Sequence, residues 1–442
     1  MNIPRNILLN RLIKAKDHHL IKVITGMRRC GKSYLLFTLF KNHLLQAGVH
    51  ASQIIEINLE DPAFINLRDA IALDTHLRTR LKSATKETFV LIDEIQLARR
   101  VLPTGVDISR FAPEDRSDCY VTFYDVLNGL LHNPLINVYI TGSNARLLST
   151  EISTYFRGRS ETIEVMPLSF AEFRPTLPEG MEFAEARDLY FTYGGLPECV
   201  LRTAERDKQE YLKDILYTIY LRDIAERHDL HSCDLLEKVT DFAMSGIGCL
   251  TNHTKLANAL TSNGTKANHV TIGKYLSYLE DAFLLKKAAR YDVKGKRYLN
   301  TQFKYYAVDT GIRNSQLNFR QVELSHLMEN AIHNELIRRG YSVDVGIVDT
   351  HPLVDGIQKC VQREIDFVVN NGSERIYVQS AFAIPDESKL EQETKSLRHV
   401  RDGFRRIVIT ADNYGSPHMD DNGITFMGLK HFFLDPKSIE TL

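Results

Sequence analysis

The residues best suited to bind a phosphate group lie near the N-terminus of the chain. Residues 26–33 have the spacing Gly-x-x-x-x-Gly-Lys-Ser. In a loop of this kind the backbone N–H groups surround the phosphates, the lysine reaches the β- and γ-phosphates, and the serine hydroxyl binds Mg²⁺. We therefore predict a nucleotide site in which Lys32 is catalytic and Ser33 is a metal ligand. The residues predicted to contact the nucleotide are Gly26, Met27, Arg28, Arg29, Cys30, Gly31, Lys32, Ser33 and Tyr34.

A second set of suitable residues is the acid pair Asp93-Glu94, which follows the apolar run 89–92. We predict that Asp93 holds Mg²⁺ through water and that Glu94 polarises the attacking water. Switch GTPases usually lack the second carboxylate, and the chain contains no guanine-reading Asn-Lys-x-Asp sequence. ATP is therefore the predicted nucleotide and hydrolysis the predicted reaction. The alternative for Glu94 is a cap on the helix that follows.

Two further candidates follow along the chain. The strand predicted from residue 136 ends at Ser143 and Asn144, either of which could sense the γ-phosphate, and we select Asn144. The same Gly-Ser-Asn sequence is also common in turns. Arg157 and Arg159 precede the next predicted strand, where oligomeric ATPases place an arginine that reaches a neighbouring subunit's nucleotide. We select Arg159 as the catalytic arginine of a homo-oligomer, and the alternative is a pair of surface arginines.

These residues need a rigid frame that brings them to one place. Residues 20–25 are a β-branched run that predicts a buried strand, and apolar residues recur at helical spacing after the phosphate loop. These apolar residues are Leu35, Leu36, Leu39, Phe40 and Leu44. The order strand, Gly-rich loop and helix is the context in which the motif indicates phosphate binding. We therefore predict an α/β fold built on the parallel sheet of a P-loop NTPase.

With these pieces in place, the chain resembles the bacterial and archaeal AAA-type ATPases that carry a C-terminal domain of unknown function. The resemblance rests on segments that occur in the family's order, namely GMRRCGKS, VLIDEIQ, YITGSNARLLSTE, FRGRSETIEVMPLSFAEF, YGGLPE, LMENAIHNELIRRG and REIDFVV. It implies a five-stranded parallel sheet with helices on both faces and the nucleotide at the carboxyl ends of the strands. It also implies that Pro197, in Gly195-Leu196-Pro197, contacts the nucleotide. The alternative is a turn, because Gly-Gly and Pro end helices wherever they occur.

We expect four segments along the chain. Residues 1–175 form the P-loop AAA-type ATPase domain, and residues 176–230 form a helical lid. Residues 231–318 form a winged-helix domain, and residues 319–442 form an inactive α/β domain similar to restriction nucleases.

The predicted winged helix is strongly basic, although the whole chain has a net charge of −1. Residues 250–307 contain ten Lys or Arg residues against three Asp or Glu residues. A winged helix binds duplex DNA by placing its second helix in the major groove and its wing against the phosphates. The residues predicted to contact DNA are Lys266, His269, Thr271, Lys274, Lys294, Lys296 and Arg297. The alternative is a structural brace that packs against the nucleotide domain.

The C-terminal segment has the element order of a small metal-dependent nuclease, with Glu329 in its first helix and Asp366 in a strand. Active members add a Glu-x-Lys sequence on the next strand, and these groups together bind metal and orient water. We assign the Glu and Lys positions to Gln379 and Ala381, and alanine supplies neither charge nor proton. We therefore expect the fold of a nuclease without its activity.

Composition sets the remaining limits. The chain has 43% hydrophobic and 25% charged residues, as soluble globular proteins do, and its six cysteines form no CxxC pair, which favours a reducing compartment. No signal peptide and no apolar run of about 18 residues is present, so we expect a cytoplasmic protein without membrane contact.

The predicted function is Mg²⁺-dependent ATP hydrolysis coupled to the binding or remodelling of duplex or branched DNA. The alternative is a nucleotide-controlled switch that docks a protein partner, in defence or regulation, and turns over slowly. An ATP-gated nuclease is disfavoured by Gln379 and Ala381.

Overall fold

The computed structural model of the chain describes residues 3–82, 84–142, 155–156, 158–230, 232–265, 267–320, 322–351, 353–354, 357–411 and 416–440. The chain divides into two compact units, Met1–Met166 and Pro167–Leu442. In the residues that the structure describes, no helix is long and apolar enough to cross a membrane.

The first unit is built on a parallel sheet, which has five strands within the described residues. The strands are β1 (Ile21–Thr25), β2 (Ile54–Asn58), β3 (Thr88–Asp93), β4 (Ile136–Thr141) and β5 (Ser160–Glu164). Their order is β2-β3-β4-β1-β5, and all neighbours are parallel. β1, β3 and β4 are buried along their whole length, as apolar strands covered on both faces are. The predicted five-stranded parallel sheet is confirmed, and β4 lies between β1 and β3 as expected.

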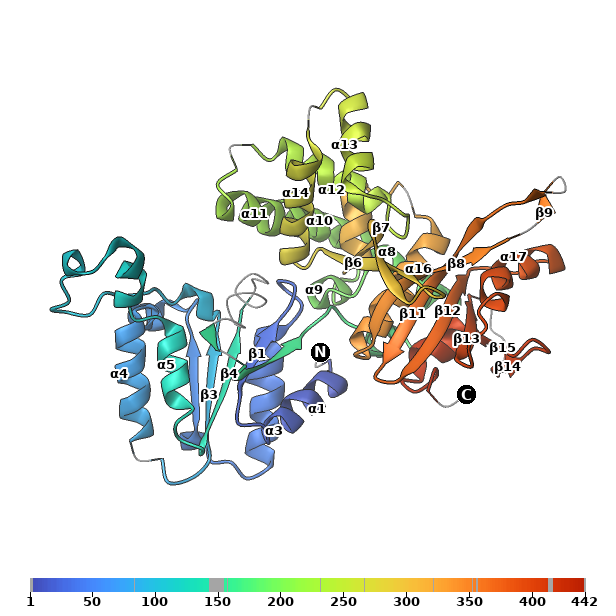
Figure 1. Cartoon of the computed structure of the whole chain (residues 1–442). Helices are drawn as coiled ribbons and strands as arrows, with labels where there is room; N and C mark the ends of the chain where they lie inside the picture. The colour runs from blue at the N-terminus through green and yellow to red at the C-terminus, as the bar shows by residue number, and fades with distance from the viewer. Residues whose placement is uncertain are drawn as a thin grey trace. The chain divides into compact units, whose positions relative to one another are not determined.

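Helices cover both faces of this sheet (Figure 1). α4 (Ala70–Leu81) and α5 (Phe123–Leu130) share one hydrophobic core with the strands. On the other face lie α1 (Asn6–Ala15) and the helix that follows the phosphate loop, where Phe40 packs on Phe89 and Tyr139. That helix comprises α2 (Lys32–Tyr34), the π-helical η1 (Leu35–Phe40) and α3 (Lys41–Gln46). The short 3₁₀ segments are η2 (Ala51–Gln53), η3 (Pro62–Arg68), η4 (Ile95–Leu97), η5 (Ile108–Arg110) and η6 (Pro113–Cys119).

The second unit begins with helices. They are α7 (Phe170–Phe173), η8 (Arg174–Thr176), α8 (Phe183–Tyr193), α9 (Pro197–Val200), α10 (Glu205–Asp214), η9 (Ile215–Leu221), α11 (Arg222–Arg227) and α12 (Asp234–Ser245). The helix, turn, helix and hairpin expected in the basic segment then follow as α13 (His253–Ser262), α14 (His269–Asp281), β6 (Leu285–Asp292) and β7 (Arg297–Ala307). Ile272, Leu276 and Leu279 of α14 are fully buried, because they recur on one side of the helix.

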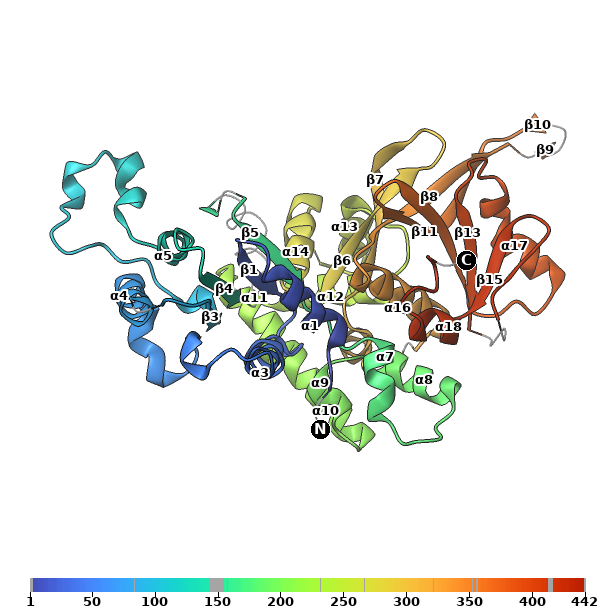
Figure 2. The ribbon, with the colours of Figure 1, turned by 90° about the horizontal axis from the view of Figure 1, so that it is seen from below.

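The rest of the second unit surrounds a mixed sheet, whose strand order within the described residues is β14-β15-β13-β12-β11-β8-β6-β7. The strands after the hairpin are β8 (Ser342–Thr350), β9 (Leu353–Val354), β10 (Ile357–Gln358), β11 (Val361–Asn371), β12 (Glu374–Ala381), β13 (Arg405–Thr410), β14 (His418–Met419) and β15 (Ile424–Gly428). The helices are α15 (Thr310–Gln316), α16 (Leu324–Arg338), α17 (Glu387–Arg398) and α18 (Leu429–Leu434). α16 and α17 pack on opposite faces of the sheet (Figure 2).

The basic hairpin belongs to this same sheet. β6 pairs in parallel with β8, with Tyr291 opposite Gly346. Val293, at the hairpin tip, is buried in one core with Val348 and Ile365. The two segments expected as a winged helix and a nuclease-like domain therefore share one sheet.

Candidate functional site

The Gly-rich loop leaves the carboxyl end of β1 and enters the helix that begins at Lys32. Gly26 has a φ of +133°, and a Cβ atom there would lie 2.1 Å from the carbonyl oxygen of Val165, so only glycine fits. Gly31 has a φ of +96° and forms the N-cap of the helix. These glycines fix a turn that ends at a helix N-terminus, where unpaired backbone N–H groups favour an anion.

Lys32 is buried, and its ammonium is held by the loop itself. Its Nζ donates hydrogen bonds to the carbonyl oxygens of Gly26, at 3.0 Å, and Met27, at 2.9 Å. The neighbouring Ser33 is exposed. A bound phosphate would compete with these carbonyls for the ammonium.

Two buried side chains, those of Arg5 and Cys30, hold the loop in place, and sequence reasoning did not single out Arg5. The guanidinium of Arg5 donates to the carbonyl oxygen of Cys30, at 3.1 Å, and to that of Met166, at 2.8 Å. Cys30 Sγ donates to the carbonyl oxygen of Val165, at 3.2 Å. Burial raises the pKa of the Cys30 thiol, which makes it a packing group and not a reactive one.

The acid pair lies at the carboxyl end of β3, at the same edge of the sheet as the phosphate loop. Asp93 is buried and accepts a hydrogen bond from the hydroxyl of Thr141, at the end of β4. The same hydroxyl accepts from the backbone N–H of Glu94, at 3.1 Å. Glu94 has a φ of +54°, a left-handed conformation that costs roughly 1–2 kcal/mol in a residue with a Cβ atom and is often found at functional sites. Although Glu94 is the N-cap of η4, its side chain makes no capping hydrogen bond.

Gln96 is a further polar residue at this edge that sequence reasoning missed. Its Nε2 donates to Oε2 of Glu94. Its Oε1 lies 3.1 Å from where a Cβ atom of Gly142 would stand, so the amide packs between the ends of β3 and β4. The signal in the sequence was a polar residue two positions after the acid pair. The geometry makes Gln96 a positioning residue for the Glu94 carboxylate.

Replacing Gln96 with leucine, which keeps the volume and removes the amide, should lower kcat for ATP about tenfold and leave KM unchanged. A hydrogen bond to a charged group contributes about 1.5–3 kcal/mol, and the role predicted for Glu94 is confined to the chemical step. Steady-state kinetics on Gln96→Leu check this. A higher kcat would show that the amide instead keeps Glu94 away from water.

Arg159 lies at the other side of the sheet, where the strands begin. It directly precedes β5, its side chain is exposed, and its carbonyl oxygen accepts from the backbone N–H of Ile21 at the start of β1. A strand of five residues spans roughly 17 Å, which separates Arg159 from the phosphate loop of its own chain. Ser143, Asn144 and Arg157 lie outside the described residues.

Pro197 is the first residue of α9, and the glycines before it have local structural reasons. Gly194 has a φ of +71°, and a Cβ atom there would lie 2.2 Å from Oδ1 of Asp309. The backbone N–H of Gly195 donates to Oδ2 of Asp309 at 2.8 Å, and Oδ1 accepts from the backbone N–H of Ile312 at 3.0 Å. The segment is therefore shaped by Asp309, and a contact of Pro197 with nucleotide stays a prediction.

Asp309 should make folding depend on pH. Burial raises the pKa of this carboxyl to about 6, although backbone N–H groups oppose the rise. In the unfolded chain the pKa is about 3.9, so the folded state binds the extra proton and the corresponding stability is present below about pH 4 and lost as the pH rises through 6.

Replacing Asp309 with asparagine removes this titration. The free energy of unfolding of the native chain, relative to Asp309→Asn, should therefore fall by about 2 kcal/mol between pH 4 and pH 7. Urea unfolding at both pH values measures this difference. A difference that stays constant between the two pH values would contradict the expectation.

The residues predicted to contact DNA divide into two groups, and Lys266 lies outside the described residues. His269 and Lys274 are exposed on α14, where the half-buried Thr271 donates its backbone N–H to Asn268. Lys296 is exposed at the hairpin tip, with a φ of +51°.

The other two hairpin residues have partners in the structure. Lys294 Nζ donates to the carbonyl oxygen of Asp349 at 2.6 Å, and Arg297 lies 3.7 Å from Asp292. Two other basic residues of the segment, Arg290 and Lys304, are buried inside the sheet.

Family models match two parts of the chain. One, described as an AAA domain, matches residues 18–174, and one described as a domain of unknown function (DUF8612) matches residues 184–323. An uncharacterized protein of Haemophilus influenzae is 34% identical over 421 residues, which are 95% of this chain and 96% of the relative. An uncharacterized protein of Methanocaldococcus jannaschii is 31% identical over 405 residues, 88% of this chain and 80% of the relative.

Solved structures with similarity to the chain include a Walker-type ATPase of Pyrococcus abyssi, with a TM-score of 0.47 and 14% identity over 72% of this chain and 96% of that one. Another is the Orc1 protein of Aeropyrum pernix in complex with DNA, with a TM-score of 0.28 and 12% identity over 72% of this chain and 93% of that one.

Proposed function

Because the chain belongs to the family of AAA-type P-loop ATPases with a C-terminal domain of unknown function, we propose that it hydrolyses ATP with the help of Mg²⁺. The observation that carries the proposal is the position of the phosphate loop and of Asp93-Glu94 at one edge of one parallel sheet. Lys32 and the loop hold the phosphates. Glu94, oriented by Gln96, accepts the proton of the attacking water.

The residues at this edge fit a magnesium ion. Mg²⁺ prefers hard oxygen ligands, and Ser33 offers an exposed hydroxyl while Asp93 offers a carboxylate at the end of β3. When bound, the ion would neutralise charge on the phosphates. Thr141, which donates to Asp93, would keep this carboxylate oriented.

We propose that the chain forms a homo-oligomer, and the position of Arg159 supports this proposal. This arginine is exposed at the sheet edge opposite its own phosphate loop, so a role in hydrolysis requires the site of a neighbouring subunit. An arginine supplied in this way stabilises the charge of the transition state.

We also propose that hydrolysis is coupled to duplex DNA through α14. The exposed side chains of His269 and Lys274 on this helix support the proposal. The hairpin supports it less, because Val293 anchors the base of the tip in the sheet core and Lys294 is held by Asp349. These hairpin contacts favour the second candidate, a switch in which the hairpin is a brace and a protein partner is docked.

Steady-state ATP hydrolysis, alone and with linear or branched duplex DNA, separates the two candidates. Coupling to DNA predicts a several-fold rise that weakens between about 50 and 200 mM salt, because phosphate contacts release counterions. Lys274→Ala should lower the salt dependence of DNA binding by about one ion, and the same change at the exposed Lys430 of α18 should not. A rate of ATP hydrolysis that does not change with any of these DNAs would exclude coupling to DNA and favour the switch.

A further inference from the structure

Three carboxylates surround a buried lysine in the second unit. Lys304 of β7 has only 2% of its side chain exposed, and its Nζ lies 2.9 Å from Glu329 of α16 and 2.6 Å from Glu364 of β11. It lies 3.9 Å from Asp366, also of β11. We call these four residues the Lys304 cluster. Its carboxylates include Glu329 and Asp366, the acids that the sequence assigned to a nuclease centre.

The other two assigned positions lie elsewhere, which corrects the expectation. Nε2 of Gln379 lies 3.5 Å from Oε2 of Glu393 in α17, and Ala381 is buried in one core with Leu397 of α17. Both side chains therefore face α17, whereas Glu329 belongs to α16 on the other face. Alternation along β12 is the reason, because residues two apart share a face.

Two of the carboxylates accept a further hydrogen bond from the protein. The hydroxyl of Tyr306 donates to Oε1 of Glu329 at 2.8 Å, and the backbone N–H of Ser380 donates to Oδ2 of Asp366 at 2.9 Å. Burial and the charge of Glu329 raise the pKa of Asp366 well above its usual value. Burial opposes the ammonium of Lys304, but the three carboxylates outweigh it and raise its pKa.

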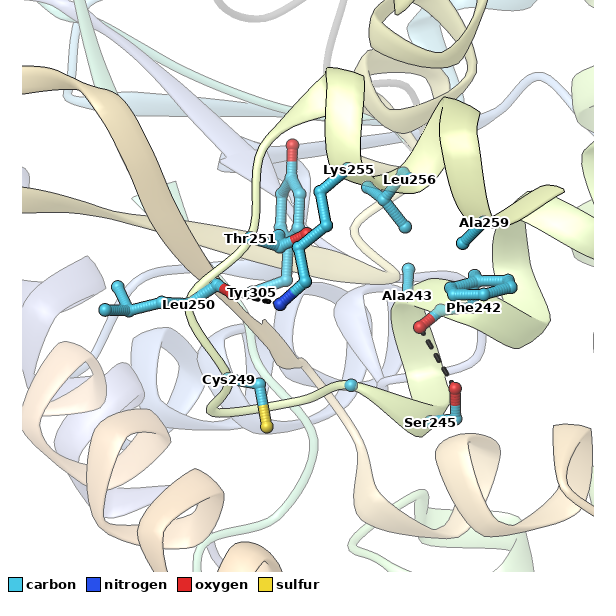
Figure 3. Close-up of a pocket in the computed structure, with 11 residues that line it drawn as sticks. Phe242, Ala243, Ser245, Cys249, Leu250, Thr251, Lys255, Leu256, Ala259 and Tyr305 are labelled. Carbon is cyan, nitrogen blue, oxygen red and sulfur yellow. Dashed lines mark hydrogen bonds between the residues drawn. The ribbon is translucent and has the colours of Figure 1, made fainter. Parts of the chain in front are cut away.

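A loop closes over Glu329. Gly248 donates its backbone N–H to Tyr305 at 2.9 Å, and Thr251 exchanges two backbone hydrogen bonds with Phe303. Gly248 has a φ of +71°, and a Cβ atom there would lie 3.2 Å from both carboxylate oxygens of Glu329. Figure 3 shows the adjoining part of this loop, Cys249 to Thr251, with Lys255 donating to the carbonyl of Leu250 beside Tyr305. The loop is thus fastened to β7 above the cluster.

The ammonium occupies the place that a metal ion would need. An ion bound by Glu329 and Glu364 would have to lie within about 2.0–2.6 Å of their oxygens, where Lys304 Nζ already makes its ion pairs. In the part of the chain that the structure describes, no group of three His, Cys, Asp or Glu side chains could hold a metal ion. A divalent ion therefore does not fit these residues as they stand.

We propose that Lys304 is the built-in cation of this carboxylate cluster, replaces the metal of a nuclease centre, and ties the hairpin to α16 and β11. The cluster then needs no metal and cleaves no phosphodiester. The positive charge of Lys304 is neutralised by internal carboxylates and does not contribute to DNA binding.

The test compares thermal unfolding of the nucleotide-free full chain with and without millimolar Mn²⁺. If Mn²⁺ changes the Tm of the native chain at all, we expect the same change in Asp366→Asn. Lys304→Ala should lower Tm by roughly 10 °C, since the buried carboxylates lose the ammonium that neutralises them. Mn²⁺ should restore part of the lost Tm in Lys304→Ala, because the ion can bind in the space left among the carboxylates. It should restore none in Lys304→Ala/Asp366→Asn.

A second variant covers the case in which Lys304→Ala does not fold. Lys304→Met/Glu329→Gln removes one charge of each sign and should be more stable than Lys304→Met alone. The proposal is overturned if this double variant is no more stable, if Lys304→Ala folds but does not respond to Mn²⁺, or if the native chain binds Mn²⁺ in a way that needs Asp366. Plasmid nicking by the native chain that Asp366→Asn abolishes would overturn it as well.

Discussion

Replacing Glu94 with glutamine should lower ATP turnover at least ~100-fold and leave ATP binding intact. A general base contributes typically 10²- to 10⁴-fold to a rate, and the amide keeps the size of the carboxylate but cannot accept the proton of water. Glu94 lies at the carboxyl end of β3 in a left-handed conformation, and its carboxylate accepts a hydrogen bond from the amide of Gln96. Phosphate release under saturating ATP, together with titration of a fluorescent ATP analogue, measures the two quantities separately.

The matched control is Glu114→Gln, which makes the same change at an exposed carboxylate of the same unit. It should leave both quantities unchanged. Turnover in Glu94→Gln within a few-fold of the native rate would exclude Glu94 as the base. Loss of nucleotide binding in Glu94→Gln would show that it shapes the site and does not act on water.

The second large effect is expected from Lys32→Met, which should weaken nucleotide binding roughly 10- to 100-fold and abolish measurable hydrolysis. Hydrogen bonds to charged groups contribute about 1.5–3 kcal/mol, and each 1.4 kcal/mol corresponds to a factor of ten in affinity. Methionine fills the buried space of the lysine stem but cannot donate to phosphate or to the carbonyls of Gly26 and Met27. The same fluorescent titration gives the change in Kd.

Lys41→Met is the control for this change. Lys41 begins α3, in the same helical stretch as Lys32, and pairs with Glu56 at 2.7 Å on a partly exposed surface. Its loss should cost less than 1 kcal/mol of stability and leave nucleotide affinity unchanged. Equal losses of affinity in the two variants would point to a damaged helix and not to a lost phosphate contact.

The phosphate site could be predicted from the sequence because its parts are short and contiguous. Residues 26–33 carry within one loop both the glycines that permit positive φ at Gly26 and Gly31 and the lysine and serine that follow. The acid pair is equally local, since it ends an apolar run that forms a buried strand in the structure. Periodicity indicated the strand and the helix that flank the loop, and the family resemblance implied the parallel sheet that brings the two segments to one edge.

Contacts between distant segments were not readable in this way. Arg5 fixes the phosphate loop from the N-terminus. Gln96 is a neighbour of Glu94 in the sequence, but its contact with the carboxylate depends on the left-handed backbone at Glu94. Neither position belongs to the spacing of a motif. The hydrogen bond that the backbone N–H of Gly195 donates to Asp309 likewise joins residues far apart in the chain.

The basic segment shows the same division. Its excess of Lys and Arg predicted a surface for DNA. The pairing of β6 with β8 instead buries Arg290 and Lys304 in the sheet, where Lys304 pairs with acids from later strands and helices. A charge count is a property of the sequence, whereas the direction in which a charge points depends on strand register. The sequence by itself therefore determined the nucleotide loop and the class of fold, whose signals are local. Only the tertiary structure decided which charges face solvent and which neutralise each other in the core, because strand pairing and alternation set that choice.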